Sequence, residues 1–194
     1  MRNAAILIFD DVEVLDFCGP FEVFSVTGQR VQGEAPFRVY TVAEQARPVL
    51  ARNGLSVNPA YTLHDCPPPD ILLIPGGRGT RPLMDNTALL DWIRAQSERV
   101  ELLLSVCTGA LLLGKAGLLD GLEATTHHSA VEELRAAAPN TILCPEKRWV
   151  DNGKIVLSAG VSAGIDMALY VVSRLLGAEV AAETAHYIQY DYWR

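Results

Sequence analysis

A single cysteine interrupts an apolar segment where a strand-like run gives way to a helix-like one. The segment is SVCTGALLLGKAGLLDG, residues 105–121, and the cysteine is Cys107. A cysteine between a strand and a helix has its sulfur at the positive end of the helix dipole, which lowers its pKa and favours a nucleophilic thiolate. The alternative is a buried, inert thiol, because free cysteine is among the residue types most often found buried. The pattern around Cys107 alone leaves both interpretations open.

Two glycines are candidates to support this nucleophile. Gly76 and Gly77 end the run DILLIPGG at residues 70–77. Their backbone N–H groups suit an oxyanion hole for a developing negative charge, although an ordinary turn has the same composition. The order of strand, cysteine, tight turn and helix is similar to a nucleophile elbow, but Ser105 stands two residues before Cys107, where that motif has glycine.

An acid and two histidines are candidates for moving protons. Asp16 lies between Leu15 and Phe17, and a carboxyl buried there is costly unless it is paired or protonated. A protonated Asp16 can donate a hydrogen bond to a thiolate or shuttle a proton. Position alone favours another role for it, the N-cap of a helix beginning near Pro20.

His127 and His128 in EATTHHSA follow another strand-like run. One of them can act as a base or orient the site, although capping and solvent-facing roles are more frequent for loop histidines. The sequence does not distinguish which of the two faces the site.

Alternating apolar runs and helical patterns predict the elements that position these residues. Such alternation is typical of an α/β fold whose parallel sheet is covered on both faces. Strands are predicted at residues 4–10, 37–43, 70–77 and 100–107, and helices at 20–28 and 87–100. Because ligands bind at the carboxyl ends of parallel strands, we expect DVEVLDFCGP, PGG and CTG to meet at one edge of the sheet.

The C-terminal part of the chain has a different pattern. RWVDNGKIVLSAG, residues 148–160, contains two strand-like runs around Asp151, Asn152 and Gly153, a strong signal for a β-hairpin. Apolar residues then recur at helical spacing and predict closing helices over residues 161–177 and 178–190.

Composition limits the class of protein. The 194 residues are 49% hydrophobic and 20% charged, which predicts a single domain over residues 1–194. The net charge of -7 argues against a nucleic-acid partner, which requires a basic surface.

No secretory leader is recognisable, and no apolar run approaches the ~20 residues of a membrane span, so we expect a cytoplasmic protein without a membrane partner. The four cysteines lack CxxC or Cys/His spacing, so neither a metal nor a disulfide is predicted, and no cofactor is expected.

With these residues identified, the chain resembles the ThiJ/PfpI family of the class I glutamine amidotransferase-like superfamily. The resemblance runs nearly end to end, through ILIFDDVEVLDFCGPFEVF, DILLIPGG, LLLSVCTGALLLGKAGLLDGLEATTHH and VLSAGVSAGIDMALYVV. Within the family it is most similar to the isonitrile hydratase-like branch, through its LD…GP…V, VCTG…LG.AGLL.G..ATTH and G.(S/T)AGID segments.

The resemblance implies a flavodoxin-like three-layer sandwich and a homodimer. It also implies a cysteine nucleophile, a threonine beside it, an acid after the first strand, two glycines lining the pocket and a nearby histidine. These residues are Cys107, Thr108, Asp16, Gly76, Gly77 and His127. The peptidase-like branch has histidine directly after the cysteine, whereas this chain has Thr108, so proteolysis is not expected.

Three functions are compatible with this resemblance. The first is cofactor-independent hydration of a small-molecule isonitrile to an N-substituted formamide. The second is a non-catalytic small-molecule or redox sensor, since Thr108 also fits the domains that precede the DNA-binding module of AraC-type regulators. The chain ends at Arg194 without such a module, which argues against a complete regulator. The third is catalysis on another carbonyl or amide-like electrophile.

Overall fold

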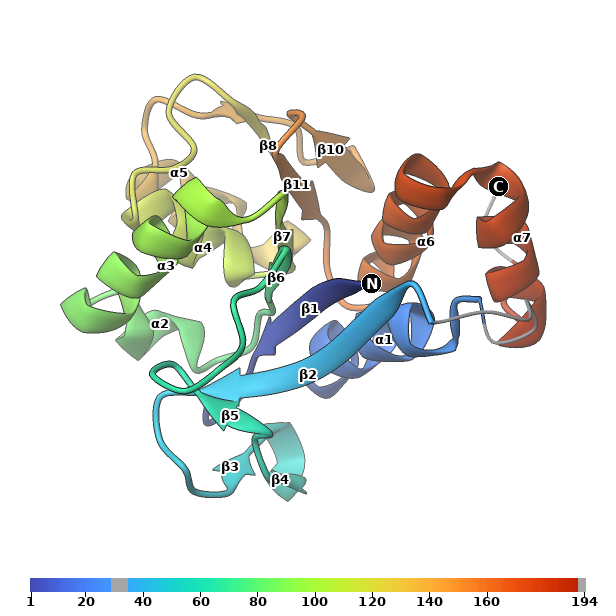
Figure 1. The fold of residues 1–194 in the computed structure, drawn as a ribbon. Helices are drawn as coiled ribbons and strands as arrows, with labels where there is room; N and C mark the ends of the chain where they lie inside the picture. The colour runs from blue at the N-terminus through green and yellow to red at the C-terminus, as the bar shows by residue number, and fades with distance from the viewer. Residues whose placement is uncertain (29–34, 192–194) are drawn as a thin grey trace.

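A seven-stranded sheet forms the centre of the molecule. The computed structural model describes residues 1–28 and 35–191, and the strand order is β10-β11-β7-β6-β1-β2-β5 (Figure 1). The strands of this sheet are β1 (Arg2–Leu7), β2 (Phe37–Ala43), β5 (Tyr61–Thr62), β6 (Ile71–Ile74), β7 (Leu102–Val106), β10 (Trp149–Asp151) and β11 (Ile155–Ser158). All neighbouring pairs are parallel except β10 with β11.

The central strands are buried on both faces. Every residue of β6 and β7 is buried, as expected for parallel strands with helices on both sides of the sheet. This two-sided burial is the reason that the strands appear in the sequence as continuous apolar runs rather than as alternating ones. All four predicted strands are therefore found: β2 has the predicted bounds, β6 and β7 are shorter than their apolar runs, and β1 begins two residues earlier and ends three residues earlier than predicted.

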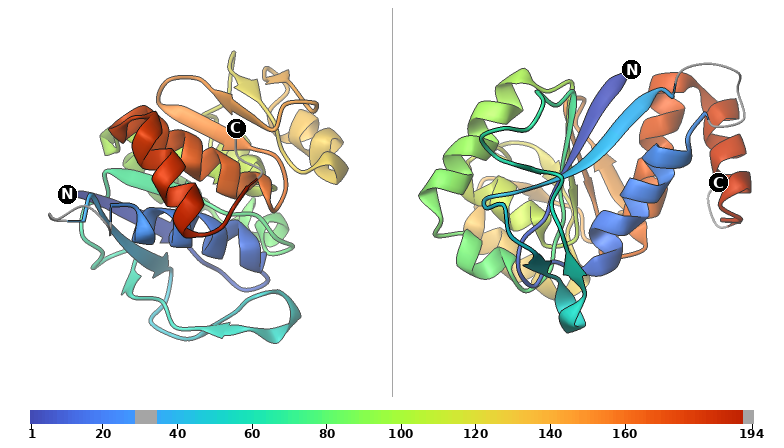
Figure 2. Two further views of the ribbon diagram at one scale, coloured as in Figure 1. Left: turned by 90° about the vertical axis from the view of Figure 1, so that its right-hand side faces the viewer. Right: turned by 60° about the horizontal axis from the view of Figure 1, so that its bottom comes forward.

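Helices cover both faces of the sheet and make a three-layer sandwich. They are α1 (Val14–Val26), α2 (Thr80–Leu83), α3 (Thr87–Arg99), α4 (Gly109–Lys115), α5 (Val131–Ala137), α6 (Ala163–Leu176) and α7 (Ala178–Tyr187). Figure 2 shows α2 to α5 on one face, and α1, α6 and α7 on the other. The predicted flavodoxin-like α/β fold is confirmed. None of the helices in the described part of the chain combines the length and apolar character that a membrane crossing requires.

The start of α1 differs from the prediction. We expected a helix beginning at Pro20 with Asp16 near its N-cap, but α1 begins at Val14 and contains Pro20 in its interior. Close packing against α6 accompanies this arrangement: a Cβ on Gly19 would lie 2.9 Å from Ile165, and one on Gly164 would lie 3.5 Å from the Pro20 ring. Asp16 consequently occupies the first turn of α1, and its N-cap role is wrong.

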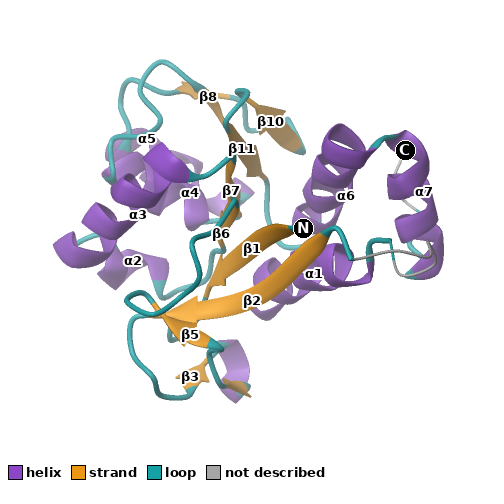
Figure 3. Ribbon diagram, viewed as in Figure 1, coloured by secondary structure: helices purple, strands orange, loops and turns teal. Residues whose placement is uncertain are grey.

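The predicted hairpin and closing helices are present. β10 and β11 pair antiparallel across a turn in which the Gly153 N–H donates to Asp151 Oδ1 at 2.7 Å. Gly177, with a φ of 101°, separates α6 from α7. Two small sheets complete the fold (Figure 3): antiparallel β3 (Val49–Leu50) with β4 (Ser56–Val57), and parallel β8 (Glu123–Ala124) with β9 (Ile142–Leu143).

Candidate active site

Three strand ends meet at one edge of the sheet. β1, β6 and β7 are neighbours, so the segments that follow them lie side by side at their carboxyl ends. Val12 forms an isolated bridge with Gly77, and the Glu13 N–H donates to the Gly76 carbonyl at 2.9 Å. The convergence expected for DVEVLDFCGP, PGG and CTG is therefore present in the fold.

Cys107 occupies a sharp turn between β7 and α4. Its φ is 57°, a left-handed conformation that is uncommon outside glycine. Its backbone N–H is shared between the carbonyls of Ser158 and Ala159, both at 3.2 Å. Gly109 makes the turn sterically feasible, because a Cβ at that position would lie only 2.0 Å from the Ile74 oxygen. This is the strand, turn and helix geometry of a nucleophile elbow.

Thr108 joins this turn to the end of β6. Its hydroxyl accepts from the Gly77 N–H at 2.9 Å and lies 3.1 Å from the Gly77 carbonyl, to which it can donate. The Gly76 N–H is also engaged, because it donates to Asp16 Oδ2 at 3.0 Å. Both glycine N–H groups are thus bonded within the chain. They position the acid and the threonine, and in this structure they are not the free oxyanion donors that we predicted.

Asp16 is a fully buried acid whose carboxyl is only partly satisfied. It is 0% exposed, and its Oδ1 has no partner of ordinary hydrogen-bond geometry among the described residues. Burial raises the pKa of Asp16 to about 7, against the opposing effect of the hydrogen bond from Gly76. Asp16 therefore changes its protonation state near neutral pH, which suits an acid that also acts as a base.

The Cys107 thiol is buried beside this acid. It is 6% exposed, and burial together with the negative charge of Asp16 raises the pKa of Cys107 to about 12. The sequence left open whether the helix dipole lowers the pKa of this thiol or the thiol is simply buried, and the raised pKa does not support the first alternative. Burial in an apolar edge and repulsion from a carboxylate outweigh the dipole of α4, which is only 7 residues long.

Asp16 and Cys107 titrate as one pair. The thiol lowers the pKa of Asp16 as a hydrogen-bond partner, and the charged carboxylate in turn raises the pKa of the thiol. Two negative charges in this buried site would repel each other. The pair therefore carries at most one negative charge at neutral pH and retains one proton. A thiolate can form there only while Asp16 holds that proton.

Backbone at the end of β11 approaches the pair from the other side. The Val161 N–H interacts with both the Asp16 carboxyl and the Cys107 sulfur and lowers their pKa values, opposing the effect of burial. Val161 has a φ of 51°, an outlier for a β-branched residue. Sequence reasoning missed this residue, although its position directly after a predicted strand end was a usable signal.

An open pocket of about 400 Å³ lies above the thiol. Its lining residues come from six separate segments of the chain. They are Glu13, Arg52, Gly77, Arg78, Arg81, Cys107, Thr108, His127, Ser129 and Val161. The arginines and Glu13 were not predicted, because they become neighbours only in the folded chain.

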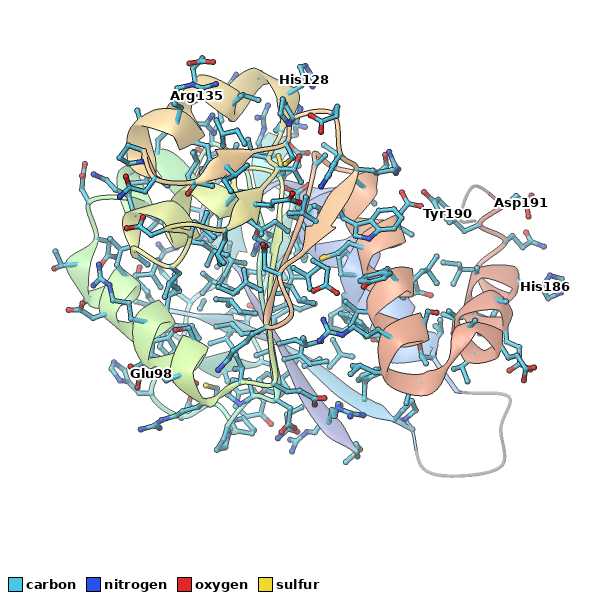
Figure 4. All side chains as sticks on the ribbon, turned by 90° about the horizontal axis from the view of Figure 1, so that it is seen from above. Glu98, His128, Arg135, His186, Tyr190 and Asp191 are labelled. Carbon is cyan, nitrogen blue, oxygen red and sulfur yellow. The ribbon has the colours of Figure 1, made fainter. Side chains whose placement is uncertain are left out.

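Of the two histidines, His127 faces this pocket. Its ring lies against Gly160, where an added Cβ would come within 2.3 Å of the ring, and its Nδ1 accepts from the Ser129 N–H at 3.2 Å. Partial burial, then the neighbouring His128 and Arg81, lower the pKa of His127. His128 is exposed at the periphery (Figure 4). The structure thus distinguishes two residues that the sequence did not.

Comparisons with known proteins agree with this geometry. A model of the DJ-1/PfpI family matches residues 2–174. Isonitrile hydratase from Pseudomonas putida is 38% identical over 176 residues, covering 90% of this chain and 72% of that protein. HTH-type transcriptional regulator GbdR from Pseudomonas aeruginosa is 25% identical over 98% of this chain, which spans about half (51%) of the regulator.

The solved structures give the same assignment. The crystal structure of a ThiJ/PfpI family protein from Pseudomonas syringae matches with a TM-score of 0.88 at 31% identity, covering 98% of this chain and 75% of that one. The fold, the elbow and the sequence match agree with the resemblance noted in the sequence. The chain belongs to the DJ-1/PfpI family.

Proposed function

We propose that this protein hydrates an isonitrile to an N-substituted formamide without a cofactor, with Cys107 as the nucleophile. The observation that carries the proposal is the buried pair of Asp16 and Cys107, which retains one proton at neutral pH. Addition to an isonitrile requires a nucleophile and a proton at the same carbon, and this pair holds both. The similarity to isonitrile hydratase supports the same reaction.

In the first half of the reaction, the Cys107 sulfur attacks the terminal carbon of R–N≡C. The thiol proton passes to Asp16 and from there to the same carbon, so a C–S and a C–H bond form. The product is a thioimidate, R–N=CH–S–Cys107, and no electrons are gained or lost. Covalent catalysis of this kind divides one difficult addition into two easier steps.

In the second half, water attacks the thioimidate carbon. Asp16 accepts one water proton and passes it to the imine nitrogen, which gives a tetrahedral R–NH–CH(OH)–S–Cys107. The C–S bond then breaks, the hydroxyl proton is lost, and the sulfur regains a proton through Asp16. The formamide R–NH–CHO leaves, and the pair returns to its starting state.

The remaining residues hold this machinery in place. Thr108 and the bonded N–H groups of Gly76 and Gly77 fix the acid relative to the sulfur, and the Val161 N–H stabilises negative charge on the pair. His127 bounds the pocket and is well placed to orient a polar substrate atom or water.

We further propose that the protein is a homodimer. Sedimentation equilibrium measures its mass in solution and tests this proposal.

The test is formamide production from a panel of alkyl isonitriles, followed by NMR. We expect Cys107→Ala and Asp16→Asn to lose turnover, whereas Cys18→Ala, a change of the same kind outside the pocket lining, retains it. Circular dichroism and urea unfolding check that each variant is folded. A folded Cys107→Ala protein that still makes formamide would overturn the mechanism.

A sensor is the second candidate, because the chain also matches a transcriptional regulator over 98% of its length. Sensing by oxidation requires an accessible thiolate, whereas Cys107 is 6% exposed and its pKa is raised. These properties argue against ready oxidation of Cys107. Stoichiometric oxidation of Cys107 at low peroxide, without turnover of isonitriles, would favour the sensor instead. If Cys107 instead turned over other carbonyl or amide-like electrophiles, the proposed nucleophile would stand but the proposed substrate would be wrong.

A further inference from the structure

The pocket above Cys107 is rich in arginine although the chain is acidic overall. Arg52, Arg78 and Arg81 line it, in a chain whose net charge is -7. Two of these arginines have acidic partners. Arg52 Nε lies 3.8 Å from Glu13, and Arg81 forms a bidentate pair with Glu133 at 2.8 and 2.9 Å.

Arg78 differs from the other two. It directly follows the two glycines at the end of β6 and is exposed. Among the described residues its guanidinium has no hydrogen-bond, ion-pair or ring partner. Of the three arginines that line the pocket, Arg78 is therefore the one whose charge has no acidic partner in the described structure. A free guanidinium presents its N–H groups in a fork that matches a carboxylate.

We propose that Arg78 binds a carboxylate of the substrate, so that the substrate is an anionic isonitrile such as an isocyano acid. This inference rests on the proposed hydratase function and specifies its substrate class. The charges also set the orientation of such a substrate. Its carboxylate is attracted to Arg78 at the mouth and repelled by the negative pair of Asp16 and Cys107 beneath, which leaves the isonitrile carbon facing the sulfur.

The size of the pocket fits this class of ligand. Its volume of about 400 Å³ is at the lower end of the range for small-molecule sites. Hydrogen bonds with an ionised partner are the stronger ones, and loss of one at a partly hydrated mouth corresponds to about tenfold in affinity. The effect should weaken with added salt, because the mouth is open to solvent.

The first experiment compares isocyanoacetate with its methyl ester, which has the same isonitrile without the charge. We expect Arg78→Gln to lower the ratio of kcat/KM for acid over ester about tenfold, mainly through KM. Arg78→Lys should restore part of the ratio. Arg99→Gln is the control, since Arg99 is exposed and unpartnered in the described structure but lies at the end of α3, outside the pocket lining.

The second experiment does not depend on hydration. Maleimidopropionate and its amide carry the same thiol-reactive group and differ in one negative charge. Peptide mass spectrometry gives the rate at which each reagent modifies Cys107, and Cys107→Ser gives the background. We expect the ratio of the two rates, acid over amide, to fall about tenfold in Arg78→Gln, as for kcat/KM. Salt should diminish the preference for the acid in the wild type.

The two experiments separate the possible failures. If no isonitrile is hydrated but the maleimide ratio falls in Arg78→Gln, the anion site stands and the hydratase proposal fails. If hydration occurs but neither ratio changes in Arg78→Gln, or Arg99→Gln changes them equally, the assignment of Arg78 is overturned and the hydratase proposal stands.

Discussion

Replacing Asp16 by asparagine should change how stability depends on pH. The pKa of Asp16 rises from 3.8 to about 7 in the folded chain, and each pH unit of such a difference is worth about 1.4 kcal/mol. Ionised Asp16 therefore lowers the free energy of unfolding by about 4 kcal/mol. The carboxyl is fully buried, so solvent screening does not reduce this figure greatly.

The sign follows from which state holds the proton. Below about pH 4 Asp16 is protonated in both the folded and the unfolded chain, and it contributes no difference. Between about pH 4 and pH 7 the unfolded chain releases this proton while the folded chain retains it, so stability falls as pH rises. Above about pH 7 Asp16 is ionised in both states, so the decrease in the free energy of unfolding is complete. The amide introduced by Asp16→Asn cannot ionise, so the variant lacks this fall.

Urea unfolding at about pH 4 and about pH 8 measures the effect. The difference in the free energy of unfolding between wild type and Asp16→Asn should change by about 4 kcal/mol between the two pH values, and the change should favour the variant at the higher pH. The buried amide of the variant adds a cost of about 1–3 kcal/mol where Asp16 Oδ1 has no partner. That cost is independent of pH and cancels in the comparison.

Asp85→Asn is the matched control, because Asp85 is exposed and its side chain has no partner in the described structure. The same change of charge there should leave the pH dependence close to that of the wild type. If Asp16→Asn and wild type kept a constant stability difference across this range, Asp16 would not be a protonated buried acid. The proton-transfer role proposed for it would then lose its physical basis.

Two further substitutions test how the pair is positioned. Thr108→Val removes the hydroxyl that accepts from the Gly77 N–H at 2.9 Å. We therefore expect the free energy of unfolding in urea to fall by about 1–3 kcal/mol and kcat to fall as well. Thr108→Ser keeps the hydroxyl and should retain most of the stability and most of kcat. Gly160→Ala places a Cβ 2.3 Å from the His127 ring, so that ring must move. We expect the folded variant to show a changed kcat/KM in steady-state kinetics. Unchanged kinetics would exclude a role for His127 in the reaction.

The sheet was predictable because its central strands obey a simple physical rule. A parallel strand covered by helices on both faces is apolar along most of its length, and this produced the continuous apolar runs in which β1, β6 and β7 lie. β3, β4 and β5 have two residues each, which is too short for any periodicity to develop. The start of α1 was mispredicted because Pro20 is typical of a first helical turn, while its actual place depends on packing against α6.

The sequence predicted which residues form the site better than it predicted their pKa values. The rule that ligands bind at the carboxyl ends of parallel strands is enough to predict from the sequence that Asp16, Gly76 and Cys107 lie together. The sign of the Cys107 pKa shift depends on burial and on the nearby carboxylate, and both arise only in the folded chain. Arg52 and Arg78 follow different strands, so no local pattern reveals that they share a pocket.

Several departures from ordinary folding rules lie around Cys107 at this edge of the sheet. The two buried side-chain atoms without partners in the described structure are Asp16 Oδ1 and Ser105 Oγ, and Ser105 lies two residues before Cys107. Cys107 and Val161 both have positive φ. Each feature costs free energy, and an alternative without the cost exists for the positive φ of Val161, where glycine would be unstrained. Destabilising features that gather around one thiol are more consistent with a reactive site than with a packing role for Cys107.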